Sequence, residues 1–162
     1  MCQAGLYVPG RAATIEAVDA VLTHFPRSEA LDIGRFADEM RRLRELFGRA
    51  TPRSLILLNE SLAATNAAES LDLAREVVGA LQVLSARVIY TTHLYELAAE
   101  SEAFNSREDG CGRVTSLVAH PGRNFRIERR PPAGSSQARE VARQYGISYG
   151  QLIEVLRQRG IG

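Results

Sequence analysis

Two apolar stretches of this sequence each end in side chains that can do chemistry. The first, Ser54–Glu60, holds four consecutive apolar residues followed by the amide of Asn59 and the carboxylate of Glu60. The second, Arg87–His93, is rich in β-branched and aromatic residues and ends in a histidine. Short unbroken apolar runs are typical of strands buried in a parallel sheet, whose ligands bind beyond the carboxyl ends of the strands. We therefore expect one site at that edge, assembled from Glu60 and His93, two side chains that can take up a proton.

The composition excludes several classes of protein. The net charge of +1 gives no electrostatic case for binding nucleic acid or a membrane surface in bulk. No apolar run approaches the roughly 20 residues of a transmembrane span. The two cysteines, Cys2 and Cys111, lack metal-ligand spacing and are too few for a disulfide framework, so we expect a reducing, cytoplasmic location.

The sequence contains no lysine, because all 20 of its basic residues are arginine. A P-loop needs a lysine to reach the β- and γ-phosphates of a nucleotide. A Walker A motif therefore cannot lie within these 162 residues.

The elements that must position the site follow from periodicity and from glycine and proline punctuation. The pattern predicts an α/β fold, with a mostly parallel sheet flanked by helices and a helix-turn-helix at the C-terminus. The expected strands are Ile15–His24, Ser54–Glu60 and Arg87–His93, with antiparallel edge strands at Val114–His120 and Asn124–Arg130. The expected helices are Arg35–Ala50, Ala67–Leu84, Leu94–Glu102, Ser136–Tyr145 and Tyr149–Arg159. The polar segment Phe104–Gly112 is expected to be a mobile loop or a hairpin.

The order of several motifs resembles one family. These motifs are Ala4–Pro9, Phe36–Met40, Ser54–Glu60, Thr92–His93, Ser135–Ala138 and Tyr145–Ser148. In this order they resemble the C-terminal part of the ATPase domain, domain V, of the MutS family of DNA mismatch-repair proteins, a relative of the ABC-type ATPases. The resemblance implies a P-loop NTPase fold and divides the chain into a partial ATPase domain, residues 1–132, and a C-terminal helix-turn-helix that dimerises, residues 133–162.

The resemblance also implies roles for particular residues. Glu60 would be the general base that activates water, and His93 would contact the γ-phosphate of ATP. Asn59 would hold a water molecule bound to Mg²⁺. Gly34 and Arg35 would lie in the signature loop that covers nucleotide on the partner subunit.

Thr65 is what remains of the loop that follows Walker B. The family's loop is glycine-rich, whereas this sequence has Leu62–Ala64. The family usually has aspartate in place of Asn59 and small hydroxyl residues in place of Gly34 and Arg35. The Walker A half is expected upstream of residue 1, where it would also supply the strands that flank Ser54–Glu60.

The resemblance therefore implies a piece of a MutS-like protein in which ATP and Mg²⁺ act together with DNA binding by upstream domains. In the full-length homodimer, ATP hydrolysis would be coupled to the binding of mismatched or branched DNA. This chain alone is not expected to hydrolyse ATP.

Other interpretations of the same residues stay open. Glu60 could be a surface or capping carboxylate, His93 a structural histidine, Asn59 a cap for the next turn, and the arginines of Arg35–Arg49 a solvated helix face. The whole unit could be a catalytically degenerate domain that senses nucleotide or binds a partner. The segment Ala138–Leu156 could instead be a helix-turn-helix that places its second helix in the major groove of DNA.

Overall fold

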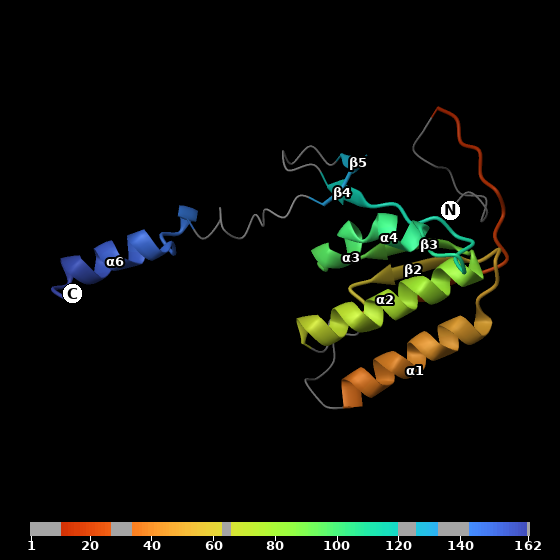
Figure 1. Cartoon of the computed structure of the whole chain (residues 1–162), viewed down its shortest axis with the longest axis horizontal. Helices are drawn as coiled ribbons and strands as arrows, with labels where there is room; N and C mark the ends of the chain where they lie inside the picture. The colour runs from red at the N-terminus through yellow and green to blue at the C-terminus, as the bar shows by residue number, and fades with distance from the viewer. Residues whose placement is uncertain (1–10, 27–33, 63–65, 120–125, 133–142, 162) are drawn as a thin grey trace. The chain divides into compact units, whose positions relative to one another are not determined.

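A computed structural model describes residues 11–26, 34–62, 66–119, 126–132 and 143–161 of the chain. It divides into two compact units, Met1–Pro131 and Pro132–Gly162. The first unit contains three parallel strands in the order β1-β2-β3 and a separate antiparallel pair, β4-β5. The strands are β1 (Val21–His24), β2 (Leu55–Asn59), β3 (Arg87–Thr91), β4 (Leu117–Ala119) and β5 (Ile127–Arg129). The helices are α1 (Gly34–Arg49), α2 (Ala67–Leu84), α3 (Tyr95–Ala99), α4 (Ser101–Asn105) and α6 (Tyr149–Gln158) (Figure 1).

The central strand β2 has both of its neighbours within this chain. It pairs in parallel with β1, with Leu22 opposite Ile56, and with β3, with Ile56 opposite Val88. This corrects the expectation that strands from an upstream segment flank Ser54–Glu60. The carboxyl ends of β2 and β3 therefore lie side by side, as the sequence predicted.

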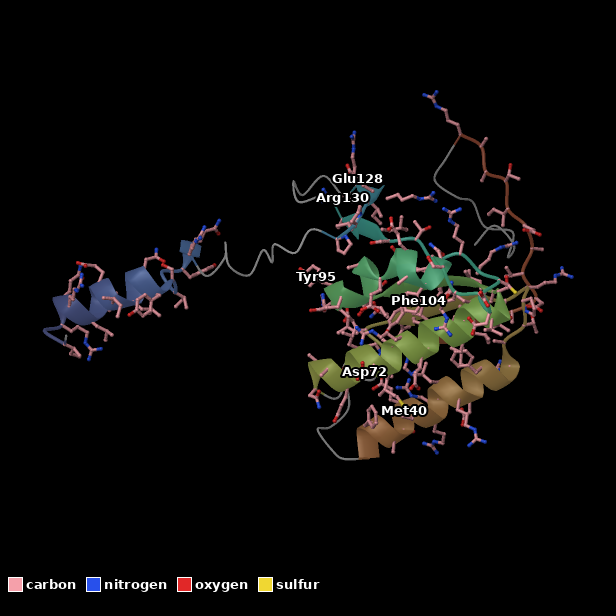
Figure 2. All side chains as sticks on the ribbon, viewed as in Figure 1. Met40, Asp72, Tyr95, Phe104, Glu128 and Arg130 are labelled. Atoms are coloured by element: carbon pink, nitrogen blue, oxygen red, sulfur yellow. The ribbon has the colours of Figure 1, made fainter. Side chains whose placement is uncertain are left out.

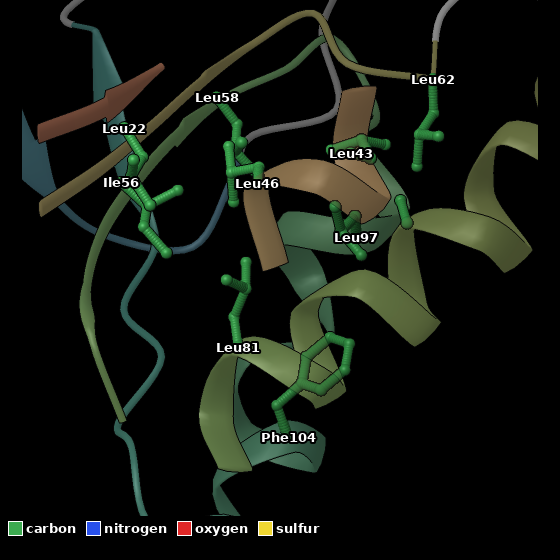
Figure 3. Close-up of a cluster of buried hydrophobic side chains, with 10 residues drawn as sticks. Leu22, Leu43, Leu46, Ile56, Leu58, Leu62, Leu81, Leu97 and Phe104 are labelled. Carbon is green, nitrogen blue, oxygen red and sulfur yellow. The ribbon is translucent and has the colours of Figure 1, made fainter. Parts of the chain in front are cut away.

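One face of the sheet forms the hydrophobic core. Leu22, Ile56 and Leu58 are buried on this face, and the helices add further leucines, an alanine and a phenylalanine (Figure 3). Met40 on α1 packs against this cluster and Phe104 on α4 belongs to it (Figure 2). The helical core residues are Leu43, Leu46, Ala74, Leu81, Leu97 and Phe104.

The opposite face of the sheet is open. Side chains alternate along a strand, so the neighbours of the buried residues point the other way. Val21 and Ile89 on this face are each 58% exposed. This face therefore leaves apolar side chains in contact with solvent.

A cluster of polar side chains fixes the amino end of the sheet, and we call it the amino-end cluster: Asp19, Thr51 and Ser54. Ser54, which is fully buried, donates its hydroxyl to Asp19 at 3.0 Å. Thr51 donates its hydroxyl to the same carboxylate. The backbone N–H of Leu55 donates to Ala20 at 2.9 Å, so the cluster closes the point where β2 begins beside β1.

The observed helices and strands confirm several predicted boundaries and correct others. Helix α2 has the predicted bounds, because the Asn66 side chain caps it by accepting from Glu69 N–H and Ser85 ends it in the left-handed conformation. Strand β1 starts at Val21 rather than Ile15, and residues 11–20 have no regular structure. Strands β4 and β5 form their own two-stranded sheet and are not edges of the parallel one.

The segment after β3 differs most from its prediction. The single predicted helix Leu94–Glu102 is two short helices that meet at Glu100, whose carboxylate pairs with Arg75 of α2 at 2.5 Å. The predicted mobile loop starts with Phe104, which is buried. Gln82 of α2 donates to the carbonyls of Phe104 and Gly112 at 3.1 and 3.0 Å and so fastens both ends of the segment.

The second unit is described only by its last helix and the turn before it. Ser148 is the N-cap of α6, and its backbone N–H donates to the side-chain oxygen of Gln151 at 3.2 Å. None of the residues of α6 is buried, and Leu152, Val155 and Leu156 are 43%, 50% and 36% exposed. Residues 133–142, which carry most of the first predicted helix of the pair, lie outside the described residues.

Candidate functional site

The structure brings Glu60 and His93 together at the carboxyl end of the sheet. His93 Nε2 lies 3.2 Å from Glu60 Oε1. The Glu60 side chain is 24% exposed and that of His93 is 92% exposed, so the pair faces solvent rather than the core. The backbone N–H of Glu60 donates to the carbonyl of Thr91 at 2.8 Å, which ties the end of β2 to the end of β3.

The turn that carries Glu60 has an unusual backbone. Glu60 and Leu62 have φ angles of 48° and 72°, in the left-handed region that favours glycine. Such a conformation costs about 1–2 kcal/mol for a residue with a side chain. It persists only where the surrounding contacts determine it. Leu62 is 1% exposed, so its side chain is anchored in the core directly after the exposed pair.

Five side chains form hydrogen bonds to or within this turn, and we call them the carboxyl-end cluster: His24, Glu39, Ser61, Ser70 and Tyr90. They come from five places in the chain, namely β1, α1, the turn itself, α2 and β3. Four of them are at most 6% exposed, and Tyr90 is half-buried.

Each contact of the cluster satisfies a polar group of the turn. The backbone N–H of Leu62 donates to Glu39 Oε1 at 2.7 Å, and its carbonyl accepts the Ser70 hydroxyl at 2.6 Å. The Ser61 carbonyl accepts the Tyr90 hydroxyl at 2.7 Å. The Ser61 hydroxyl lies 2.7 Å from His24 Nδ1. Buried polar groups need such partners, and these contacts satisfy the backbone groups of the turn, whereas His24 Nε2 is buried without a hydrogen-bond partner.

The electrostatics of the cluster keep two of its members neutral at neutral pH. Burial, followed by the charges of Glu39 and Glu60, raises the pKa of Tyr90 to about 12. Its hydroxyl therefore remains a donor to Ser61. Burial and the nearby charge of Arg42 lower the pKa of His24, and the charge of Glu39 offsets part of that effect.

The other predicted site residues are placed as follows. Asn59 is the last residue of β2, pairs with Thr91 and is partly exposed on the open side of the sheet. Gly34 is the first residue of α1 and is exposed. Arg35 is the second residue of α1, and its side chain is not described. Thr65 lies outside the described residues.

No sequence pattern had indicated Glu39 or Ser61 as site residues. Glu39 lies three residues after Phe36 and four before Leu43, which are both on the inward stripe of α1. A carboxylate on an apolar stripe needs a buried partner, and that mismatch is the signal that could have found it. The partner is a backbone N–H, which no sequence pattern marks.

The chemistry of the described donors fits only part of a nucleotide site. A carboxylate, an imidazole and the Asn59 carboxamide suit water, a terminal phosphate and a Mg²⁺-bound water, respectively. Within the described ranges, no group of three or more histidine, cysteine, aspartate or glutamate side chains could hold a metal directly. With no lysine in the sequence, a P-loop that cradles phosphates cannot lie within these residues. None of the described helices is long and apolar enough to cross a membrane.

The fold and the site together define the class of this chain. It is a parallel α/β unit with a carboxylate and a histidine at neighbouring strand ends. Residues 1–155 match the family described as MutS domain V, and the chain belongs to that family. It is 33% identical over 159 residues to the DNA mismatch repair protein MutS 2 of Haloarcula marismortui, covering 91% of this chain and 16% of that protein. It is 31% identical over 153 residues to the DNA mismatch repair protein MutS of Acetivibrio thermocellus, covering 91% of this chain and 17% of that protein. The chain thus spans about a sixth of the length of these relatives.

Proposed function

We propose that this chain is the hydrolytic half of an ATPase site in a MutS-like protein. The observation that best supports this proposal is the 3.2 Å contact between Glu60 and His93 at adjoining strand ends, in a chain of the MutS domain V family. Binding and hydrolysis of ATP would be coupled to the binding of mismatched or branched DNA by other parts of the parent protein. The phosphate cradle would come from an upstream P-loop.

In this proposal each side chain has one task. Glu60 accepts a proton from the water that attacks the terminal phosphate, and its partial burial limits competing solvent. His93 donates a hydrogen bond to a phosphate oxygen. Mg²⁺, when bound with ATP, neutralises charge on the phosphates. Asn59 accepts from a water on that ion, but its amide brings no negative charge.

The test is ATP hydrolysis by the gene product extended upstream to include a P-loop, beside the 162-residue chain. We expect turnover in the extended protein and none in the short one. Glu60→Gln should lower kcat by a factor of about 10²–10⁴ and leave ATP binding intact. Glu76→Gln, an exposed carboxylate on α2, is the matched control and should leave kcat unchanged. Equal rates in both variants would refute the role of Glu60.

A second candidate function is a nucleotide-sensing domain without hydrolysis, and Asn59 favours it. An amide at the end of β2 should weaken Mg²⁺ binding, because it lacks the charge of a carboxylate. Asn59→Asp in the extended protein separates the two functions. A gain in turnover supports a slow ATPase limited by Mg²⁺. Binding of ATP with no turnover in either variant supports the sensor.

We also propose that the C-terminal helices carry a homodimer interface. The apolar side chains of α6, Leu152, Val155 and Leu156, remain exposed, which suits a protein partner better than a DNA groove. Sedimentation of the extended protein checks this. Val155→Asp should shift the dimer toward monomer, whereas Gln158→Asp, on the same helix, should not. Salt-dependent DNA binding lost in both variants would instead favour a DNA-reading helix.

A further inference from the structure

The strongest feature that the proposed function leaves unexplained is a buried carboxylate on α1. Glu39 is 6% exposed, whereas the other acidic residues of α1, Asp38 and Glu45, are not buried. Burying a carboxylate is unfavourable unless it is hydrogen-bonded. Its one described hydrogen bond goes to the backbone N–H of Leu62, at 2.7 Å. A buried carboxylate from a separate helix therefore accepts a hydrogen bond from the backbone of the turn that carries Glu60.

The contact falls at the strained point of that turn. Leu62 is the second of the two left-handed residues, and Glu60 is the first. If the N–H of Leu62 lost its acceptor, a buried donor would be left unsatisfied, at a cost in free energy. That cost is similar to the strain that the turn stores, so a relaxed backbone without left-handed residues would become competitive. Relaxation would move Glu60 away from His93.

The other members of the carboxyl-end cluster cannot replace this contact. Tyr90 and Ser70 donate to the carbonyls of Ser61 and Leu62, and His24 bonds the Ser61 hydroxyl. All three leave the Leu62 N–H without an acceptor. A carboxylate is also the stronger partner, because hydrogen bonds to charged acceptors exceed neutral ones.

We propose that Glu39 is a positioning residue that locks the left-handed turn after β2 and so aims the Glu60 carboxylate beside His93. The role rests on the proposed function, because aiming matters only if Glu60 acts as a base. It also ties the helix that begins at Gly34 to the hydrolytic edge of the sheet. The lock itself is a property of the 162-residue chain and can be measured without nucleotide.

The first experiment measures amide hydrogen exchange of Leu62 by NMR in the 162-residue chain, relative to Ile56 in the middle of β2. Glu39→Ala should speed exchange at Leu62 by about 10-fold or more while Ile56 changes less. Glu39→Gln, which keeps an oxygen acceptor, should restore most of the protection. Leu43→Ala is the structural control: it removes a buried leucine from the same helix and should raise exchange at both amides alike. Unchanged protection of Leu62 in Glu39→Ala, or an equal rise at both amides, would overturn the proposal.

The second experiment measures steady-state ATP hydrolysis in the extended protein. Glu39→Ala should lower kcat by about 10-fold or more with little change in KM, because a misaimed base affects the chemical step and not ATP binding. Glu39→Gln should recover most of kcat, and Leu43→Ala should keep kcat at temperatures where it stays folded. No hydrolysis by the unsubstituted protein would refute the proposed function and the catalytic part of this inference, while the exchange data would still decide whether Glu39 locks the turn. Normal kcat in Glu39→Ala would refute the positioning role and leave the proposed function standing.

Discussion

The amino-end cluster and the carboxyl-end cluster use similar chemistry at opposite ends of the same sheet. Each joins a carboxylate, hydroxyls and backbone groups from segments that are far apart in the sequence. They differ in the backbone that they support. Asp19, Thr51 and Ser54 themselves do not have a positive φ, whereas the carboxyl-end cluster surrounds two left-handed residues, Glu60 and Leu62.

The difference separates a structural cluster from a candidate site. Burial of polar groups is common to both ends and is therefore not a sign of function by itself. Of the two described ends, the carboxyl end alone combines a strained turn with an acid–histidine pair, the partly buried Glu60 and the exposed His93. Strain of this kind is retained where the surrounding structure enforces it, and it gathers at functional sites.

The largest change in stability that tests the difference between the two clusters is expected at Leu62. Leu62→Ala should lower the free energy of unfolding by about 2–5 kcal/mol, because it empties a buried site. Leu62→Gly should be about 1 kcal/mol more stable than Leu62→Ala, because glycine relieves the left-handed φ of 72°. At Leu58, a buried strand residue, the order should be reversed, with glycine the weaker by about 0.5–1 kcal/mol. Urea denaturation of the four variants measures this, and the same order at both positions would show that the turn is not strained.

A smaller effect should separate the two clusters by pH. The folded pKa of His24 is lowered from its ordinary 6.5 by burial, so the unfolded chain takes up this proton first. The contribution of the neutral His24 side chain to the free energy of unfolding is therefore fully present above about pH 6.5, and it is lost as the pH falls below that value. Urea midpoints between pH 7.5 and pH 5 should decline in the unsubstituted chain. In His24→Gln the decline should be weaker, and an unchanged decline would assign it to another group.

The amino-end cluster should respond only in stronger acid, and less. The hydrogen bond from Thr51 lowers the pKa of Asp19 below 3.8, and the hydrogen bond from Ser54 lowers it further. Burial acts in the opposite direction and offsets part of this effect. Its contribution is present above that pH and is lost as the pH falls through the lowered value. Asp19 is solvent-exposed, so the slope should be shallower than that of His24. Asp19→Asn should flatten the stability curve below about pH 4, and no difference there would remove Asp19 from the cluster.

The smallest expected effect is at His93. Its side chain is 92% exposed, so His93→Ala should change the free energy of unfolding by less than about 0.5 kcal/mol. Thermal denaturation of the 162-residue chain would measure the change. A clear loss of stability would mean that His93 is structural and would weaken the contrast between the two ends of the sheet.

The sequence predicted the elements that local patterns specify. Helix α2 was placed correctly because its apolar period begins after Asn66, a capping residue. The apolar runs before Glu60 and His93 correctly predicted strands β2 and β3, but the expectation that both are buried was wrong for β3, which has no buried residue. The break at Glu100 was not predictable, because it depends on Arg75 of another helix. The lock by Glu39 was missed for the same reason, since its partner is a backbone group at residue 62. Tertiary contacts decide these features, and local propensity does not record them.

The topology of the parallel sheet also constrains how the chain folds. Among the described residues, both outer strands pair only with β2, and each pairing closes a segment that contains a complete helix. Such non-local pairings require loop closure, which lowers the entropy of the chain before any stabilising contacts form. The sheet should therefore form more slowly than a helical domain of similar length. Because the turn that bears Glu60 joins β2 to these non-local pairings, we expect it to take its final shape late in folding.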